Sequence, residues 1–465
     1  MLTPTIDPTW AWQTYEPSDH SPWNLRRAGH LYRRATFGAN WTELQKAVEQ
    51  GPEKTIEQLL AGGKNQAEFS QQVAEMAATI GPADESPLRA WWLFRMLLTP
   101  HPLEEKLTLF WHNHFATSIA KVKNARLMLA QNELLRKQAL GNFGQLLQDI
   151  SKDPAMLIWL DTNQNKKGTP NENYARELME LFSLGIGNYT EADVREGARA
   201  FTGWELKDDQ FHFNANQHDG GDKTFLGKSG NWHGEDIVRI CLEQEAAPLF
   251  IIGKLYRFYV SDGETPNKEL LRPLAIQLRE SNFDLKEVVA TILRSNLFFS
   301  DQVYRAKIKS PVEFGVGIVR ALEGRVGPQP LAEAMEGLGQ RLFAPPSVKG
   351  WDGGQAWINS TTLLLRHNLA LALTSTQDSH FGRRTDPAEI VRRQEKTSDE
   401  QAIDFFTGLF LQTDIPDAAR EKLREYAKSA REQTYPKFWS VADRENHRLR
   451  AICHLMLTQP EFQLC

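Results

Sequence analysis

A helix is predicted by Pro170-Asn171-Glu172-Asn173-Tyr174-Ala175-Arg176-Glu177-Leu178-Met179-Glu180-Leu181-Phe182, the stretch around which the rest of the chain is interpreted. Pro170 with Asn171 is typical of a helix start, and Gly185 is typical of a helix end. At about 100° per residue, one face of this helix is apolar, and we expect it to be buried. Its members are Tyr174, Leu178, Leu181 and Phe182. The opposite face should meet solvent or a partner, and it holds Glu172, Arg176 and Ser183.

The edge of the apolar face carries three polar residues, Asn173, Glu177 and Glu180. Carboxylates at such an edge are partly removed from water, which shifts their pKa and makes a charged partner favourable. One interpretation is a functional site on this edge. The other is a salt-bridged surface helix in which Glu172 pairs with Arg176 at i,i+4.

The composition is that of an ordinary soluble globular protein. The chain has 465 residues, of which 41% are hydrophobic and 24% charged, and its net charge is −5. It has no block of Lys and Arg, which disfavours nucleic-acid binding through a basic surface. It has 13 Trp, and Trp fills cores but also forms platforms for flat or sugar-like ligands.

The cysteines and the first residues bear on the compartment. Cys241, Cys453 and Cys465 are far apart, which excludes a zinc ribbon or a disulfide scaffold and fits a reducing compartment. The first residues lack the basic and apolar regions of a signal peptide, and no run reaches about 18 apolar residues. We therefore expect a cytoplasmic location with no membrane span, or a periplasmic location if a leader was removed.

Hydrophobic periodicity predicts an all-α fold: one large multi-helix domain with long Gly- and Trp-rich functional loops and at most a small β-hairpin, within residues 210–227. Two short helices at 41–50 and 52–61 are separated by Gly51. The predicted organisation is an extended N-terminal arm at 1–22, a main helical domain at 23–374, a polar linker at 375–400 and a small helical unit at 401–465 packed on the main domain.

A second informative helix, predicted at 103–118, contains Phe110-Trp111-His112-Asn113-His114-Phe115. His114 lies in the middle of its apolar face, and His112 points about 200° away. The two therefore cannot bind one metal ion from a regular helix. His114 is either a core histidine bonded to a carboxylate or carbonyl, or a ligand or acid/base group.

Two loops are further candidates. His218-Asp219-Gly220-Gly221-Asp222-Lys223-Thr224-Phe225-Leu226-Gly227 combines His and Asp, a common ligand set for metals, with Gly residues that let a ligand approach the backbone. The same residues can instead stabilise a turn. In the second loop, 345–357, Lys349, Trp351, Asp352 and Trp357 form either an aromatic wall with polar groups or a loop that its Trp residues hold on the helices.

Six segments occur in order over about residues 25–370: 30–38, 110–115, 171–177, 201–204, 218–227 and 349–351. In combination they resemble the bacterial family called domain of unknown function 1800. The resemblance brings no established activity, but it implies that the helices and loops above belong to one site. It also implies a partner from the domain of unknown function 1501 family, which is similar to sulfatases and phosphatases, because the two are often encoded side by side. Many members carry export signals, and none is visible here.

Two functional hypotheses follow, and no GxGxxG, P-loop, GxSxG, HExxH or CxxCH motif narrows them. The first is an enzyme, either a metal-dependent hydrolase or oxidoreductase or an acid/base catalyst without metal, that acts on a polar substrate such as a glycan or modified peptide. Its catalytic residues would be Glu177, His114, Glu180 and His218. Its substrate contacts would be Asn173, Arg176, Trp204, Lys223, Lys349, Trp351 and Trp357. One divalent metal ion would be held by His114, Glu177, His218 and Asp219.

The second hypothesis is a non-enzymatic binding or assembly protein that works with a domain of unknown function 1501 partner. In that case the central carboxylates pair with Arg33, Arg34 or Arg176 and hold the helices together. A fully paired Glu177 favours this hypothesis. An unpaired Glu177 that faces a pocket beside His114 favours the enzyme.

Overall fold

The computed structural model describes residues 6–263, 266–375, 380–381 and 386–465. Within them it has 24 α-helices and only two small antiparallel sheets, which confirms the all-α prediction. The first nine helices are α1 (Pro8–Trp12), α2 (Leu25–Ala35), α3 (Trp41–Gln50), α4 (Pro52–Ala61), α5 (Gln66–Ala78), α6 (Glu85–Leu98), α7 (Pro102–His114), α8 (Ile119–Val122) and α9 (Ala125–Lys137).

The middle and the last part of the chain are equally helical. The middle helices are α10 (Phe143–Ser151), α11 (Pro154–Trp159), α12 (Asn173–Glu177), α13 (Glu191–Ala200), α14 (Gly234–Glu243), α15 (Ala246–Tyr259), α16 (Lys268–Glu280) and α17 (Leu285–Arg294). The last are α18 (Pro311–Ala321), α19 (Pro328–Gly337), α20 (Ser360–Thr374), α21 (Pro387–Arg393), α22 (Asp399–Leu411), α23 (Asp417–Glu432) and α24 (Val441–Leu457). Short 3-10 turns are η1 (Thr162–Gln164), η3 (Ala215–Gln217), η4 (Gly354–Trp357) and η5 (Pro460–Gln463), and η2 (Leu178–Ser183) is a π-helix.

The two sheets are hairpins, one more than the sequence predicts. Strand β1 (Trp204–Lys207) pairs with β2 (Gln210–Phe213), and β3 (Lys223–Phe225) pairs with β4 (Lys228–Gly230). In each hairpin both turn residues have positive φ, Asp208 and Asp209 in the first and Leu226 and Gly227 in the second. Such turns suit the twist of two-residue hairpins. Neither hairpin lies within residues 210–227, where one was predicted: β2 and β3 fall in that range but belong to different hairpins, because strands of three or four residues are too short to show a clear alternation.

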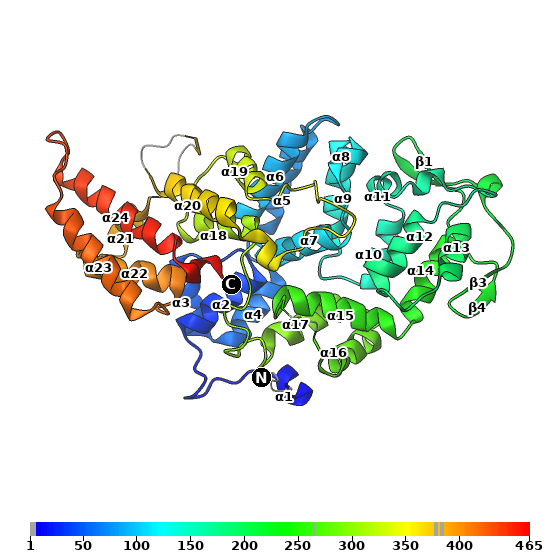
Figure 1. Ribbon diagram of the computed structural model, residues 1–465, viewed down its shortest axis with the longest axis horizontal. Helices are drawn as coiled ribbons and strands as arrows, with labels where there is room; N and C mark the ends of the chain where they lie inside the picture. Colours follow the sequence, from blue (N-terminus) through cyan, green and yellow to red (C-terminus); the bar gives the residue numbers. More distant parts are fainter. Residues whose placement is uncertain (1–5, 264–265, 376–379, 382–385) are drawn as a thin grey trace.

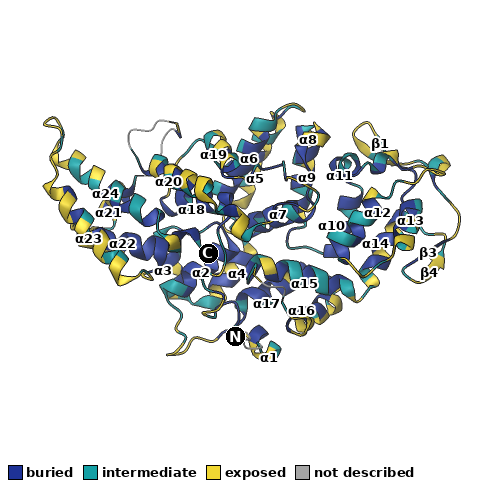
Figure 2. Ribbon diagram, viewed as in Figure 1, coloured by how far each residue is buried: buried dark blue, intermediate teal, exposed yellow. Residues whose placement is uncertain are grey.

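The body is elongated, and its elements follow one another along the long axis (Figure 1). Helices α10 to α14 with both hairpins lie at one end, and α21 to α24 lie at the other. Two hydrophobic clusters fill the interior. One joins α7, α10, α12, α14, α15 and α17, and the other joins α6, α18, α20, α22 and α24. Figure 2 shows α7 as a buried helix near the middle, and its residues Leu107 and Leu109 belong to different clusters.

The predicted N-terminal arm and linker both contain helix. Helix α1 lies within the arm, where Trp12 is buried and donates from Nε1 to the Leu270 carbonyl at 2.6 Å. Helix α21 lies within the predicted linker, because Ile390 and Val391 supply buried apolar contacts; residues 376–379 and 382–385 of that linker lie outside the described residues. Helices α22 and α24 share a hydrophobic cluster with α18 and α20. The domain boundaries themselves stay a prediction.

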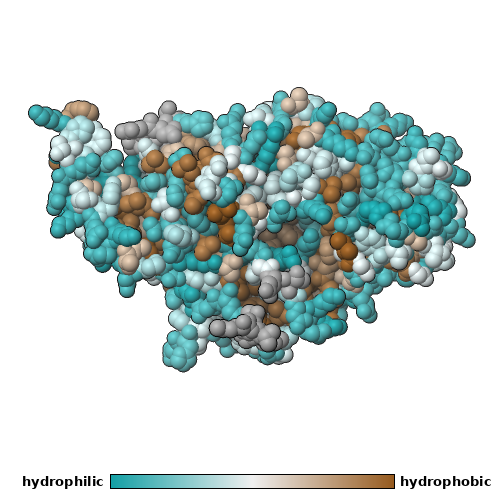
Figure 3. Space-filling view, viewed as in Figure 1, coloured by the Kyte–Doolittle hydropathy of each residue, from teal (hydrophilic) through white to brown (hydrophobic). Residues whose placement is uncertain are grey.

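The surface is mainly hydrophilic, as Figure 3 shows for one face, with hydrophobic residues gathered toward the middle. Leu364 and Leu371 of α20 are exposed hydrophobic residues. No described helix combines the length and the apolar character needed to cross a membrane.

Candidate functional site

The central helix changes its winding in the middle of the predicted stretch. α12 ends at Glu177 and continues as the π-helix η2, in which the Ser183 hydroxyl donates to the Leu178 carbonyl at 2.5 Å. Tyr174, Leu178 and Phe182 are buried as predicted, but Ser183 is also fully buried, so its predicted exposure is wrong. The wider π turn rotates residues after Leu178 away from their α-helical positions. Single π turns inside helices occur frequently at functional sites.

Glu177 is half-buried and has no hydrogen-bond or ion-pair partner among the described residues. Burial and the neighbouring Glu180 raise its pKa, while Arg176 and Lys349 act in the opposite direction. Arg176 is instead paired with Glu172 at 3.0 Å and Glu191 at 2.7 Å on the surface. A carboxyl group with a raised pKa and no partner is a candidate general acid or base.

Arg33, Arg34 and Glu180 do not complete a network around Glu177. Arg34 donates to the carbonyls of Val260 and Val303, and Arg33 donates to Gln412. Glu180 accepts a hydrogen bond from the Tyr189 hydroxyl at 3.0 Å. In the described part of the chain, neither Glu177 nor Glu180 therefore pairs with an arginine, as a purely structural helix would require.

His114 is a buried histidine whose Nε2–H donates to the Phe182 carbonyl at 3.1 Å. This carbonyl lies in the last turn of η2, where helix carbonyls lack intrahelical partners. The ring is surrounded by aromatic residues, including Phe110, Phe115 and Phe250. His114 thus stabilises the end of η2, which corresponds to the carbonyl-bonded alternative of the sequence analysis.

His112 points to the other side of α7, as predicted, and packs against Trp92, Phe343 and Trp351. Its Nε2 is buried without a hydrogen-bond partner among the described residues. Burial lowers the pKa of His112 to about 3, and burial together with Lys254 lowers the pKa of His114 to about 3. Both rings are therefore neutral in the folded protein at neutral pH.

These two histidines predict a loss of stability in mild acid. Their pKa values are about 3 in the folded state and about 6.5 when unfolded, so the unfolded chain binds more protons between these limits. Their contribution is fully present above about pH 6.5 and declines as the pH falls toward 3, by about 1 kcal/mol per pH unit for each ring. Urea unfolding between pH 7.5 and 5 measures the slope. His112→Phe should flatten it and the exposed His20→Asn should not; an equal slope in all three proteins would contradict the assignment.

Asn113, between the two histidines, fixes the Gly350–Trp351 backbone against α7. Its Oδ1 accepts from the Trp351 N–H at 2.7 Å, and its Nδ2 donates to the Trp351 carbonyl at 3.4 Å. Gly350 has φ +81°, and a Cβ at this position would lie 2.2 Å from Asn113 Oδ1. The segments 110–115 and 349–351 are thus two halves of one contact, and only glycine allows their close approach.

This contact shapes a cleft with a volume of about 310 Å³. Its walls come from α7, α15, the start of α18 and the loop 340–357. Four aromatic residues line it: Phe110, Phe258, Trp351 and Trp357. Trp351 and Trp357 are 8% and 9% exposed, so they anchor the loop and also form part of the wall.

Four cations and three carboxylates also line the cleft: Lys254, Arg257, Lys307, Lys349, Asp262, Glu313 and Asp352. Two of the carboxylates are paired. Lys307 Nζ lies 3.4 Å from an Asp262 carboxylate oxygen, and Lys106 forms an ion pair with Glu313. Burial alone would raise the pKa of Glu313, but the attraction to Lys106 outweighs it and lowers that pKa to about 2. Lys254 and Lys349 have no ion-pair or hydrogen-bond partner for Nζ among the described residues. Beside its aromatic walls, the cleft therefore offers two ammonium groups without a direct ion-pair partner in the described part of the chain.

Lys254 is the most unusual of these cations. Its ammonium lies 5.2 Å from the centre of the Phe250 ring, and burial and Arg257 lower its pKa. Sequence analysis missed it, together with Lys307, because a lysine on an amphipathic helix or in a loop is usually a surface residue. The signal in the sequence is its position on α15 four residues after Phe250 and four before Phe258, at helical spacing between two aromatic residues.

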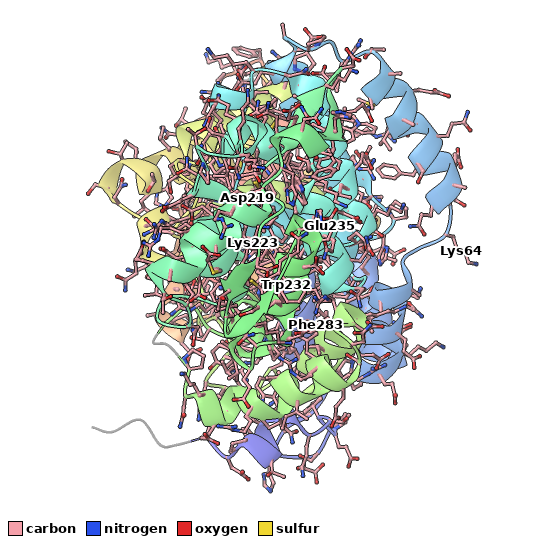
Figure 4. The ribbon with its side chains drawn as sticks, turned by 90° about the vertical axis from the view of Figure 1, so that its right-hand side faces the viewer. Lys64, Asp219, Lys223, Trp232, Glu235 and Phe283 are labelled. Carbon is pink, nitrogen blue, oxygen red and sulfur yellow. The ribbon has the colours of Figure 1, made fainter. Side chains whose placement is uncertain are left out.

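The His218–Gly227 loop lies elsewhere. Hairpin β3–β4 is at one end of the molecule, whereas the loop before α20 lies near its middle (Figure 1). Asp219 is paired with Arg199 at 2.8 Å, which lowers its pKa to about 2, and His218 donates to the Thr202 carbonyl and stacks on His233. Figure 4 shows Asp219 and Lys223 close together on this end, and Lys223 Nζ donates to the Asp219 carbonyl at 2.6 Å.

The predicted metal set of His114, Glu177, His218 and Asp219 is therefore not assembled. His114 is bonded to Phe182, and His218 and Asp219 serve the turn at the far end. In the part of the chain that the structure describes, no group of three or more His, Cys, Asp or Glu could hold a metal ion.

The predicted ligand contacts divide in the same way. Lys349, Trp351 and Trp357 line the cleft. Trp204 is instead buried between Phe201 and Phe211, and Lys223 is only 1% exposed, so neither faces this cleft. Asn173 and Arg176 lie on the outer side of α12. Glu177 and Glu180 do not line the cleft; Lys349 of the cleft acts on the pKa of Glu177, and so does Glu180.

An all-α protein with a polar, Trp-lined cleft is the class that the fold and the site define. The chain belongs to the DUF1800 family: the family described as "Protein of unknown function (DUF1800)" matches residues 30–464. No curated protein and no solved structure matches the chain.

Proposed function

We propose that this chain is an enzyme that binds a polar, negatively charged substrate, such as an acidic glycan or a modified peptide, in the cleft between α7, α15 and the loop 340–357. The observation that carries the proposal is the pair of unpaired ammonium groups, Lys254 and Lys349, beside Trp351 in that cleft. Lys254 is partly buried, and an unpaired cation in that position is unfavourable alone, a cost that an anionic ligand offsets; Lys349 is exposed and adds a second positive charge at the mouth of the cleft. Indole rings offer the flat apolar surface that sugar rings use.

The catalytic part of the proposal rests on Glu177. It is unpaired, its pKa is raised, and Lys349 lies close enough to influence it. We infer that Glu177 acts as general acid or base on a group bound near Lys349. His114 and Glu180 would act as positioning residues, His114 through the end of η2 and Glu180 through its effect on Glu177. A divalent ion, if the reaction uses one, would need donors other than the four predicted.

Glu177→Gln should separate binding from chemistry. Since Glu177 has no partner, we expect the free energy of unfolding to change by less than about 0.5 kcal/mol. Turnover of a bound acidic substrate should fall by about 10²–10⁴, the usual contribution of a general acid or base. Urea unfolding and turnover assays on the same preparations test both parts. A loss of several kcal/mol would instead identify Glu177 as a structural residue.

The binding part is tested first, by titration calorimetry with matched acidic and neutral oligosaccharides and peptides. Lys349→Met should raise the Kd for an acidic ligand about tenfold or more, because one charge-assisted contact is lost. The exposed Lys286→Met is the matched control and should leave Kd unchanged. If no acidic ligand binds, or if Lys286→Met and Lys349→Met behave alike, the proposed substrate class is wrong.

The second candidate is a binding or assembly protein that works with a domain of unknown function 1501 partner. This function is favoured by the role of His114: a residue predicted to be catalytic instead donates a hydrogen bond to the Phe182 carbonyl and stabilises the end of η2. In that case the cleft would take an acidic segment of the partner, and Lys349→Met would weaken binding while Glu177→Gln changed nothing. A cytoplasmic location remains a prediction under either function.

A further inference from the structure

Behind the cleft lies a second, smaller cavity of about 40 Å³ that the proposed function does not use. It lies between α2, α18, the end of α22 and η5. Its lining includes Arg33, Lys309, Glu313, Gln412 and Phe462. Glu313 also lines the cleft, so the two hollows share one residue.

Arg33 is the first unusual group in this cavity. Its side chain is buried, and Nη1 donates to Gln412 Oε1. Nε and Nη2 are buried and have no hydrogen-bond partner among the described residues. The Arg33 guanidinium carbon lies 5.6 Å from the centre of the Tyr304 ring, and Tyr304 acts to raise the pKa of Arg33, but the Tyr304 hydroxyl forms no hydrogen bond with Nε or Nη2. A guanidinium keeps its charge in proteins, so the unused donors need an acceptor.

Lys309 is the second unusual group. It is buried, its ammonium lies 3.6 Å from the centre of the Phe462 ring, and no hydrogen-bond acceptor or carboxylate contacts Nζ within the described residues. Arg33 and Lys309 line the same cavity, and burial and repulsion from Arg33 keep the pKa of Lys309 well below that of an ordinary lysine.

The negative charges nearby do not compensate both cations. Glu313 is bound by Lys106 and accepts from the Ser310 N–H at 2.6 Å. Arg305 acts to lower the pKa of Arg33, and Arg366 acts to lower that of Lys309. Cys465 acts to raise both pKa values, and Glu313 acts to raise that of Lys309, but no carboxylate pairs directly with either cation among the described residues. An uncharged ligand or water would satisfy the donors of Arg33 but would leave the repulsion in place.

We propose that this cavity is a binding site for a small inorganic monoanion of the size of chloride, held between the Arg33 guanidinium and the Lys309 ammonium. A volume of about 40 Å³ exceeds the 10–15 Å³ of accessible space that one water needs, and it is small for a ligand of many atoms. Because the site joins α2 to α22 and η5, the bound anion stabilises the packing of the C-terminal helices on the rest of the chain.

Bromide is the probe, because its anomalous scattering identifies it in a crystal. In crystals of the full chain soaked in bromide, we expect an anomalous peak between Arg33 and Lys309. In solution, the Tm should rise with added sodium bromide or chloride but not with sodium gluconate, whose anion is too large, since binding to the folded state alone raises stability. Lys309→Met should remove both the peak and the halide-dependent rise, and Lys286→Met should retain both.

Several outcomes would overturn the proposal: density without anomalous signal in the cavity (water only), bromide only at surface cations, or an equal halide response in Lys309→Met. If Lys309→Met does not fold, the anomalous peak in the unmodified protein decides alone. Because Lys309 does not line the cleft, Lys309→Met leaves the ligand titrations of the proposed function as an independent test.

Discussion

Glu105→Gln should lower the free energy of unfolding by about 3–5 kcal/mol, because Arg136 and Arg95 lose their buried counter-ion and keep only Glu133, whose side chain is 43% exposed. Glu105 is only 1% exposed. Arg136 donates to both of its oxygens, at 2.7 Å from Nη2 and 2.9 Å from Nε. Trp92 Nε1 donates at 2.6 Å, and Arg95 lies 3.5 Å away. Glu105 lies on α7, and its carboxylate thus joins α7 to α6, which carries Trp92 and Arg95, and to α9, which carries Arg136.

The pH dependence of the same group has a definite sign. Although burial raises it, Arg136 and Arg95 lower the pKa of Glu105 below its ordinary value. Its contribution is therefore present above the unfolded pKa, near 4.3, and is lost as the pH falls through the lower folded value. The difference in stability between the unmodified protein and Glu105→Gln should accordingly shrink in acid.

Glu269→Gln is the matched control for this prediction. Glu269 pairs with Arg272 at 3.0 Å, but both side chains are more than half exposed. Exposed pairs contribute about 0–1 kcal/mol, so this change should be close to neutral. Urea unfolding at pH 7 compares the two variants. Equal small losses in both would mean that Arg136 and Arg95 find other acceptors, and the network would then have no special role.

The sequence predicts the helices well where they carry local signals. Residues 41–50 and 52–61 are predicted as two helices and form α3 and α4 with these bounds, because Gly51 ends one and Pro52 begins the other. The winding of η2 is not predictable in this way. A helical wheel assumes one rotation per residue, so it assigns Ser183 to the wrong side when the chain adds a π turn.

The candidate site is predicted only in part, since it depends on long-range contacts. Lys349, Trp351 and Trp357 are found from the loop's composition, and they line the cleft. His218 looks equally suitable, but tertiary packing places its loop at the far end of the molecule. The sequence also cannot show that His114 meets the carbonyl of Phe182, a residue 68 positions away.

Gly350→Ala should disrupt the cleft more than any other single change to its loop. The new Cβ would lie 2.2 Å from Asn113 Oδ1 and 2.5 Å from the Asn113 carbonyl oxygen, and the backbone there has φ +81°. A positive φ costs a residue with a Cβ about 1–2 kcal/mol, and overpacking about 1–3 kcal/mol more. We expect stability to fall by about 2–5 kcal/mol and the affinity for the acidic ligand to fall with it.

Gly337→Ala is the matched control, because a Cβ at Gly337 meets nothing within 4 Å and its φ is not positive. It should be neutral or slightly stabilising, since Ala suits a helix end better than Gly.

Asn113→Ala removes the side-chain oxygen that the new Cβ at position 350 would meet, but the Asn113 carbonyl oxygen stays. The double variant Asn113→Ala/Gly350→Ala should therefore recover only part of the stability that Gly350→Ala loses. Urea unfolding and ligand titration on all four proteins separate two cases. If affinity falls and stability does not, the loop adjusts locally and the cleft alone is lost. If both fall together, α7 and the loop fold as one unit, and the Asn113–Gly350 contact is what joins the two segments of the site.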